Sequence, residues 1–287
     1  MTLYRGMDKE TLNREYSPSS CVEDIMPYIQ AYIDESAAAY DLLAEQCRSG
    51  VKYGPEDRSV VDIFTPNGSG PCPVHIFIHG GYWQELSVRE SVFAAPNFVA
   101  HDIVFMALDY TLAPEASLTE IVEQVRRGVL WILENCAEYG GDKSNITLSG
   151  SSAGAHLVAE VLATDWNAQG YEECPIKGAC EVSGVFDLTP LVHTYVNDPL
   201  QLTETEVQNL SPANHIPSHA CPVVFAYGDN ETSEFKRQTR DYCADWVKTG
   251  HPASFMELAG FNHFDVIMEL GHKDGRLFQA VLDQIRA

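Results

Sequence analysis

The segment Gly150-Ser151-Ser152-Ala153-Gly154 constrains the fold of this sequence more than any other. It follows an apolar, strand-like run at 146–149 and opens a helical run at 153–163. A Gly-x-Ser-x-Gly sequence between a strand and a helix is typical of a nucleophile elbow, a sharp turn that lifts the serine above the edge of a sheet. A Cβ at either flanking glycine would collide with neighbouring backbone. Ser152 is therefore the candidate nucleophile.

Short apolar runs alternate with amphipathic patterns along most of the chain. We expect strands at 51–53, 60–64, 74–78, 103–108, 146–148, 178–182, 223–227 and 253–258, and helices at 118–139, 153–163, 234–248 and 276–285. Nearly all-apolar strands that alternate with helices predict an α/β fold, with a mostly parallel sheet covered on both faces. The length of 287 residues fits one large domain over 1–287.

Two regions depart from this alternation. Residues 1–20 look irregular, and Ser20 to Glu23 has capping-box spacing ahead of a helical pattern from Met26 to Leu42. This predicts an N-terminal helical arm over about 1–50, whose helix lies over one edge of the fold. The segment from about 187 to 222 is rich in Leu, Thr, Asn and Pro, and is either a small cap over the site or a plain surface excursion.

The charge balance argues against polyanionic partners. With 18 basic and 41 acidic residues the net charge is −23, which disfavours nucleic acid and anionic membranes. No signal-like or membrane-spanning run is present, so we expect a soluble cytoplasmic protein that acts on a small molecule. The eight cysteines lack disulfide or zinc spacing, and no metal or nucleotide motif is seen, so we expect no metal and no cofactor.

A serine hydroxyl becomes a strong nucleophile only beside a base that is itself oriented by a third group. In chains with such an elbow, an acid and then a histidine follow the serine. Asp229 and Glu231 follow one expected strand and His263 follows the next, at the same carboxyl edge of the sheet. His263 is the candidate base, and these residues leave Asp229 and Glu231 open as its acid. His156, one helical turn after Ser152, is expected to pack or cap.

The segment His79-Gly80-Gly81-Tyr82-Trp83 follows the strand expected at 74–78. A His-Gly-Gly loop at this place supplies one backbone N–H of an oxyanion hole in esterase-like enzymes, and the residue after the nucleophile supplies the other. Gly80 or Gly81, together with Ala153, would then hold the developing oxyanion.

Taken together, these segments resemble the α/β-hydrolase kynurenine formamidase (arylformamidase) family over nearly the whole chain. The resemblance is carried by Tyr16-Ser17-Pro18-Ser19, His79 to Trp83, Gly150 to Leu157, Ser183-Gly184-Val185-Phe186-Asp187-Leu188, Glu234-Phe235 with Arg237-Gln238, and His263-Phe264-Asp265. The elbow is common to many hydrolases. The Tyr82-Trp83 pair and the segment from Ser183 to Leu188 are more particular to this family.

The resemblance implies a serine nucleophile at Ser152, a base at His263 and oxyanion donors in the glycine loop and at Ala153. The family's acid precedes a Glu-Phe pair by three residues, which places it at Glu231. Many relatives have Asp there, so this chain departs in side-chain length, and Asp229 remains the alternative acid.

Membership would imply hydrolysis of N-formyl-L-kynurenine to kynurenine and formate in tryptophan breakdown, and the family suggests a homodimer. A formyl group needs a small acyl pocket, and Tyr82 and Trp83 either wall it or pack in the core beside the loop. The alternatives are another amidase or carboxylesterase of this fold acting on a different N-acyl compound or ester, and a ligand-binding protein without turnover.

Overall fold

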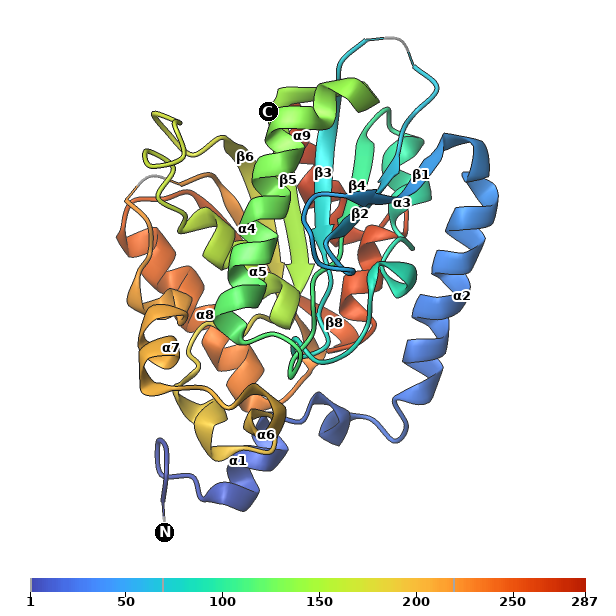
Figure 1. The fold of residues 1–287 in the computed structure, drawn as a ribbon. Helices are drawn as coiled ribbons and strands as arrows, with labels where there is room; N and C mark the ends of the chain where they lie inside the picture. The colour runs from blue at the N-terminus through green and yellow to red at the C-terminus, as the bar shows by residue number, and fades with distance from the viewer. Residues whose placement is uncertain (1, 69, 219) are drawn as a thin grey trace.

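An eight-stranded sheet runs through the centre of the computed structural model, which describes residues 2–68, 70–218 and 220–287 (Figure 1). The strand order is β1-β2-β4-β3-β5-β6-β7-β8. The strands are β1 (Cys47–Lys52), β2 (Val60–Phe64), β3 (Cys72–Ile78), β4 (Val104–Leu108), β5 (Gly141–Ser151), β6 (Ile176–Val182), β7 (Val223–Asn230) and β8 (Ala253–Asn262). The pairs β1–β2 and β2–β4 are antiparallel and the others are parallel, which confirms the predicted mostly parallel sheet.

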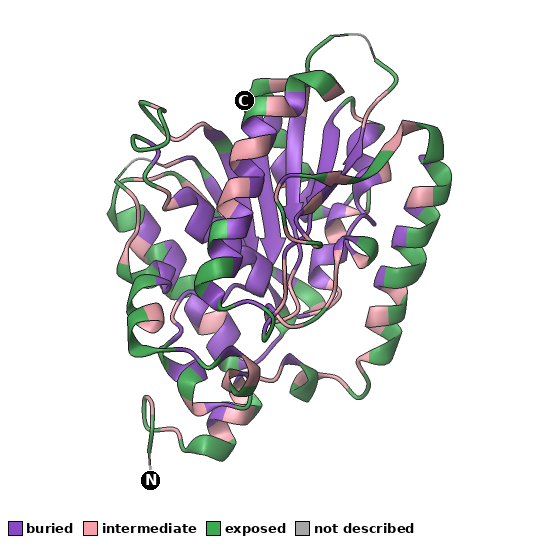
Figure 2. Cartoon of the chain, viewed as in Figure 1, coloured by how far each residue is buried: buried purple, intermediate pink, exposed green. Residues whose placement is uncertain are grey.

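Helices cover both faces of the sheet. They are α1 (Lys9–Glu15), α2 (Met26–Leu42), α3 (Ala95–Val99), α4 (Leu118–Asn135), α5 (Ala153–Leu162), α6 (Asn197–Leu200), α7 (Glu204–Asn209), α8 (Ser233–Lys248) and α9 (Arg276–Arg286). One core lies under α4, α5 and α8, and the other under α2, α3 and α9. Successive strand residues alternate between them, as Ile76 and Phe77 do. The inner strands are buried, whereas the edge strands β1 and β8 are largely exposed (Figure 2).

Helix α4 shows why the regular part of the fold follows from the sequence. Ser117 and Glu120 form a capping box that fixes its start, and apolar residues three and four apart form its buried stripe. The helix predicted at 118–139 divides into α4 and a 3-10 turn (Cys136–Tyr139). Gly140 then ends the turn in the left-handed conformation, with φ of 76°.

The N-terminal arm differs from the prediction in detail. Residues 1–20 contain helix α1, whose first turn is capped by the Asp8 carboxylate, so the expectation of an irregular segment is wrong. The capping box predicted at Ser20 is also wrong, because Ser20 lies in a 3-10 turn and α2 begins at Met26 with Pro27 in its first turn. Helix α2 lies beside the β1–β2 edge, where Tyr40 donates a 2.5 Å hydrogen bond to Asp62 of β2 (Figure 1).

The segment at 187–222 folds as short helical pieces rather than as a strand-helix unit. Helices α6 and α7 lie there between 3-10 turns (Thr189–His193 and Pro212–Asn214). Hydrogen bonds tie the segment to the rest of the chain; among them, Gln84 donates to the Val196 carbonyl at 2.9 Å, and the Tyr195 N–H donates to Asn13 of the arm at 3.0 Å. Its role as a cap, and the single-domain division, stay predictions.

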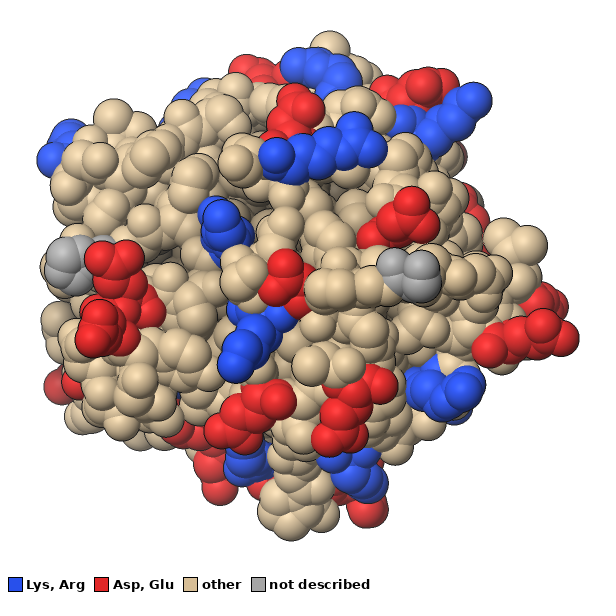
Figure 3. Space-filling view, turned by 90° about the horizontal axis from the view of Figure 1, so that it is seen from above, with Lys and Arg blue, Asp and Glu red and all other residues tan. Residues whose placement is uncertain are grey.

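Seen from above, acidic and basic side chains are scattered over the surface with wide uncharged areas between them (Figure 3). Within the described ranges, no helix is long and apolar enough to span a membrane.

Candidate active site

The elbow forms at the predicted place, between the last residue of β5 and the first of α5. Ser152 adopts φ of 57° and ψ of −119°, a conformation that non-glycine residues rarely take. Its N–H donates to the Val182 carbonyl of β6 at 2.8 Å. A Cβ at Gly150 would collide with the Gly154 carbonyl, and one at Gly154 with the Ile78 carbonyl of β3. The turn is therefore compressed between two strands and a helix, which holds Ser152 in its strained conformation.

His263 and Glu231 come together at the carboxyl edge of the sheet. Nδ1 of His263, which follows β8, lies 2.8 Å from Oε2 of Glu231, which follows β7, and both side chains are buried. Asp229 is exposed, and its carboxylate accepts instead from the Gly260 N–H at 2.8 Å. Since His263 and Ser152 line the same cavity, Nε2 of His263 is the nitrogen left to act on the serine.

Glu231 is held by more than the histidine. Its other oxygen, Oε1, accepts from the Ser183 hydroxyl at 2.6 Å and from the Gly228 N–H at 2.7 Å. Ser183 directly follows β6, has φ of 51°, and donates its own N–H to the Ala226 carbonyl at 2.8 Å. Ser183 belongs to a segment that carries the family resemblance, but the sequence predicted no site role for it. Its place just after a strand, at the edge where the acid lies, was the available signal.

The glycine loop passes close to the elbow. Gly80 and Gly81 both line the cavity, and a Cβ on Gly80 would lie 2.7 Å from the Ser151 carbonyl. Gly81 has φ of 91°, which favours glycine. Neither glycine N–H donates to another residue of the described ranges. Ala153 is the first residue of α5, so its N–H has no partner within the helix. These are the three N–H groups that the sequence predicted for an oxyanion hole.

His79 fixes the start of this loop. Its Nε2 lies 3.2 Å from Oδ1 of Asp109, and its ring stacks on Tyr110 with centroids 4.2 Å apart. Burial raises the pKa of Asp109, but hydrogen bonds and charges from His79 and Arg58 outweigh burial and hold it below its usual range. The carboxylate therefore stays ionised and anchors the loop.

A cavity of about 250 Å³ opens over Ser152 and His263. Its wall is mainly apolar and aromatic, and it draws residues from the arm, the glycine loop and the histidine loop. Other lining residues include Pro18, Ser19, Ile25, Ile29, Tyr32, Phe77, Phe93, Tyr195, Phe264 and Ile267. Tyr195 and Val196 bring the segment at 187–222 to the same cavity.

The structure separates the two aromatic residues that were paired as substrate-binding candidates. Tyr82 lines the cavity and donates its hydroxyl to the Tyr16 carbonyl at 2.7 Å. Trp83 is fully buried, away from the cavity wall, and packs edge-to-face on His156 at 4.9 Å. Trp83 therefore packs in the core beside the glycine loop, which was the alternative left open for it, and we assign it no contact with substrate. His156 also packs, with Nε2 2.7 Å from the Leu210 carbonyl, and burial lowers its pKa.

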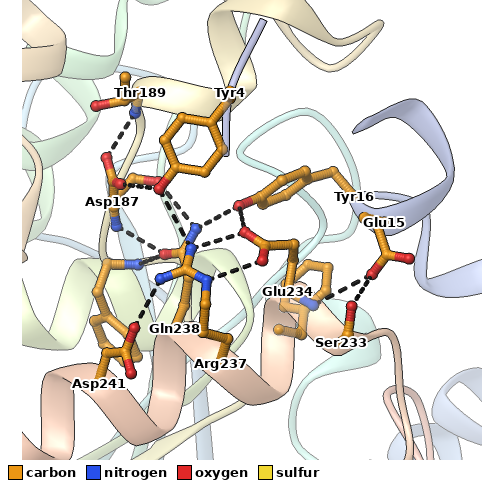
Figure 4. A network of polar contacts seen from close by, with 12 residues as sticks. Tyr4, Glu15, Tyr16, Asp187, Thr189, Ser233, Glu234, Arg237, Gln238 and Asp241 are labelled. Carbon is orange, nitrogen blue, oxygen red and sulfur yellow. Dashed lines mark hydrogen bonds and ion pairs between the residues drawn. The ribbon is translucent and has the colours of Figure 1, made fainter. Parts of the chain in front are cut away.

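A buried polar network joins the arm to α8 (Figure 4). The Tyr16 hydroxyl donates to Glu234 at 2.9 Å and accepts from Gln238 at 2.8 Å, while Arg237 pairs with Glu234 at 2.7 Å. Burial raises the pKa of Glu234, but the hydrogen bond and charge of Arg237 outweigh burial and lower it overall. The Tyr16 carbonyl accepts the hydrogen bond from the Tyr82 hydroxyl, so this network also fixes the position of Tyr82 in the cavity wall.

Comparisons with known proteins bear on the family and the fold of this chain. The family model described as BD-FAE matches residues 61–242. The kynurenine formamidases of Salmo salar and Danio rerio are each 34% identical to this chain, and the alignments cover 98% and 99%, respectively, of both partners. A solved structure from Silicibacter sp. TM1040 has a TM-score of 0.83 at 24% identity, covering 96% of this chain and 99% of that one. An esterase from Pyrobaculum calidifontis has a TM-score of 0.71 at 17% identity, covering 97% of each.

The sheet order, the strained serine turn and the neighbouring histidine-carboxylate pair define an α/β-hydrolase of the esterase and formamidase group. Within that group, the chain belongs to the kynurenine formamidase family, which confirms the resemblance seen in the sequence. Among the described residues, no group of three or more His, Cys, Asp or Glu side chains could hold a metal ion.

Proposed function

We propose that this chain is a serine hydrolase that cleaves N-formyl arylamides, with N-formyl-L-kynurenine as its substrate and L-kynurenine and formate as its products. The observation that carries the proposal is the buried His263–Glu231 pair, whose histidine lines the same small cavity as the strained Ser152. The 34% identity with kynurenine formamidases over 98% of the chain supports the choice of substrate.

In the proposed reaction, Ser152 Oγ attacks the formyl carbon while Nε2 of His263 takes the hydroxyl proton. Glu231 holds the Nδ1–H of His263 and stabilises the imidazolium that forms. The carbonyl oxygen becomes an oxyanion, which accepts hydrogen bonds from the backbone N–H groups of the glycine loop and Ala153.

The tetrahedral intermediate collapses when His263 returns its proton to the aryl nitrogen. The C–N bond breaks, the arylamine leaves, and a formyl ester remains on Ser152. His263 then deprotonates a water that attacks this ester. Formate is released, and the serine regains its proton.

The cavity supports a small substrate with an aromatic ring. Its volume of about 250 Å³ lies below the usual range for drug-sized ligands, and its wall supplies apolar and aromatic surface for an aryl group. Glu85 and Glu90 are the acidic side chains of this wall, and its described lining residues include no Lys or Arg. This charge favours an ammonium group, such as the α-ammonium of a kynurenine-type amino acid, on the part of the substrate that lies against Glu85 and Glu90.

The second candidate is a carboxylesterase or another small amidase. The same serine, histidine and backbone donors would act on an ester, and the Pyrobaculum calidifontis protein of similar fold is an esterase. This alternative needs no change in the assignment of Ser152, Glu231 or His263.

Steady-state hydrolysis of N-formyl-L-kynurenine, compared with p-nitrophenyl acetate, tests the proposal. We expect kcat/KM of about 10⁴ M⁻¹s⁻¹ or more for the formyl substrate. Ser152→Ala should abolish both activities, while Ser149→Ala should retain them, because Ser149 faces His75 in the core of the sheet. Clear ester turnover with weak formyl-kynurenine turnover would select the second candidate. Full activity in Ser152→Ala would refute the serine mechanism.

A further inference from the structure

Helix α2 contributes to the cavity although it lies outside the region matched by the family model, residues 61–242. Ile29 and Tyr32 of α2, with Ile25 just before it, line the cavity together with Ser152 and His263. Residues four and three apart share one face of a helix. One face of α2 therefore forms a wall of the site.

This wall is attached directly to the histidine loop. The Tyr32 hydroxyl donates to the carbonyl of Phe264, the residue after His263. The ring of Tyr28 stacks on Phe264 with centroids 5.8 Å apart, and Tyr32 stacks on Phe93 at 5.9 Å. The position of α2 is therefore fixed relative to the candidate base, as a size limit on the substrate requires.

Helix α2 also meets solvent next to this face. Ile33, one turn after Ile29, is 41% exposed, and Met26 is 60% exposed. The helix thus carries two isoleucines one turn apart, of which Ile29 lines the cavity and the more exposed Ile33 does not.

We propose that α2 is the specificity-determining wall of this hydrolase, and that Ile29 limits the size of the group that fits beside Ser152. The inference rests on the serine-hydrolase part of the proposed function but not on formyl-kynurenine as substrate. Under this proposal, the wild-type site accepts short acyl groups and single-ring arylamines. A difference of one methylene in a hydrophobic pocket changes kcat/KM by about 10- to 200-fold, so a change from isoleucine to alanine is large enough to measure.

The test compares Ile29→Ala, Ile29→Trp and the matched control Ile33→Ala in two substrate series. One series varies the acyl group, from p-nitrophenyl acetate to butyrate and hexanoate. The other varies the leaving group, from formanilide to N-formyl-2-naphthylamine. Ile29→Ala should raise the large-to-small ratio of kcat/KM at least tenfold in one series. Ile29→Trp should lower the same ratio, and Ile33→Ala should leave it within about twofold.

The proposal is overturned if Ile29→Ala changes neither ratio, or if Ile33→Ala changes them equally. Far-ultraviolet circular dichroism and the thermal midpoint of each variant show whether it is folded, and Ile29→Val replaces any variant that is not. A result that overturns the proposal differs from a failure of the proposed substrate. If the wild type cleaves esters but not formyl-kynurenine, the large-to-small ratios of kcat/KM can still be measured with the ester series. If no substrate turns over, the rates at which short and long alkyl phosphonates label Ser152 give the same comparison.

Discussion

Replacing Ser183 by alanine tests how the acid of this site is held. Its hydroxyl donates a 2.6 Å hydrogen bond to Oε1 of Glu231, while Oε2 of the same carboxylate faces His263 at 2.8 Å. Ser183→Ala removes this donor and leaves the Gly228 N–H, at 2.7 Å, as the remaining donor to Oε1 described here. The glutamate can then rotate, and the imidazole loses its fixed orientation.

The magnitude follows from the type of bond. A hydrogen bond to a charged group contributes about 1.5–3 kcal/mol. A tenfold change in rate corresponds to about 1.4 kcal/mol, so the loss is about 10- to 100-fold if it is expressed in the transition state. Because Ser183 lies behind the acid and outside the cavity lining, the loss should fall on kcat, with KM nearly unchanged.

The assay is a double-mutant cycle with Glu231→Gln, read by kcat, KM and the thermal midpoint. If Ser183 acts through Glu231, Ser183→Ala should cost little further activity in the Glu231→Gln background. Ser211→Ala is the matched control, since Ser211 is a fully buried serine that hydrogen-bonds in the segment at 187–222. Equal losses of kcat in both backgrounds, or the same loss in Ser211→Ala, would refute the reasoning.

Three further predictions concern stability and the elbow. Glu181 of β6 is fully buried and neither of its carboxylate oxygens has a partner among the described residues, so burial raises its pKa well above the usual value. The folded state then keeps a proton that the unfolded chain releases, so the free energy of unfolding of the wild type falls as pH rises above about 4. Glu181→Gln should remove this fall. Measured by urea unfolding, the difference in free energy of unfolding between the variant and the wild type should be largest at pH 8 and vanish near pH 4. Tyr16→Phe removes the buried hydroxyl that donates to Glu234 and accepts from Gln238, and should lower the free energy of unfolding by about 1–3 kcal/mol; a change below about 0.5 kcal/mol would contradict the network. Gly154→Ala should abolish ester hydrolysis, because its Cβ meets the Ile78 carbonyl; retained activity would show that the elbow is looser than described.

The regular elements could be predicted because their signals are local. Apolar runs located the inner strands, and an amphipathic pattern located α4. Helix α1 was missed because it has seven residues and buries only Leu12 of them, so no helical stripe is visible. The antiparallel direction of β2 was equally hidden, because an apolar run reads the same in both directions.

The site shows the same division between local and distant information. Ser152 and His263 follow from a motif and from chain order. The choice between Asp229 and Glu231 does not, because both leave β7 at the same edge and only the packing of β8 decides which carboxylate meets the histidine. The sequence alone also could not predict that Tyr82 lines the cavity while Trp83 is buried in the core. Both have positive φ, of 51° and 59°, in a turn without a periodicity that would predict side-chain direction.

The contact between Tyr32 and Phe264 joins helix α2 to the histidine loop at the cavity, across most of the length of the chain. Chain termini are ordinarily where a protein frays first, and such fraying is usually harmless. Here helix α2 supplies a wall and the loop after β8 supplies His263, so loosening of either segment disassembles the site while the central strands remain folded. We therefore expect enzymatic activity to be lost under mild denaturant before the secondary structure, as activity and far-ultraviolet circular dichroism measured on the same samples would show.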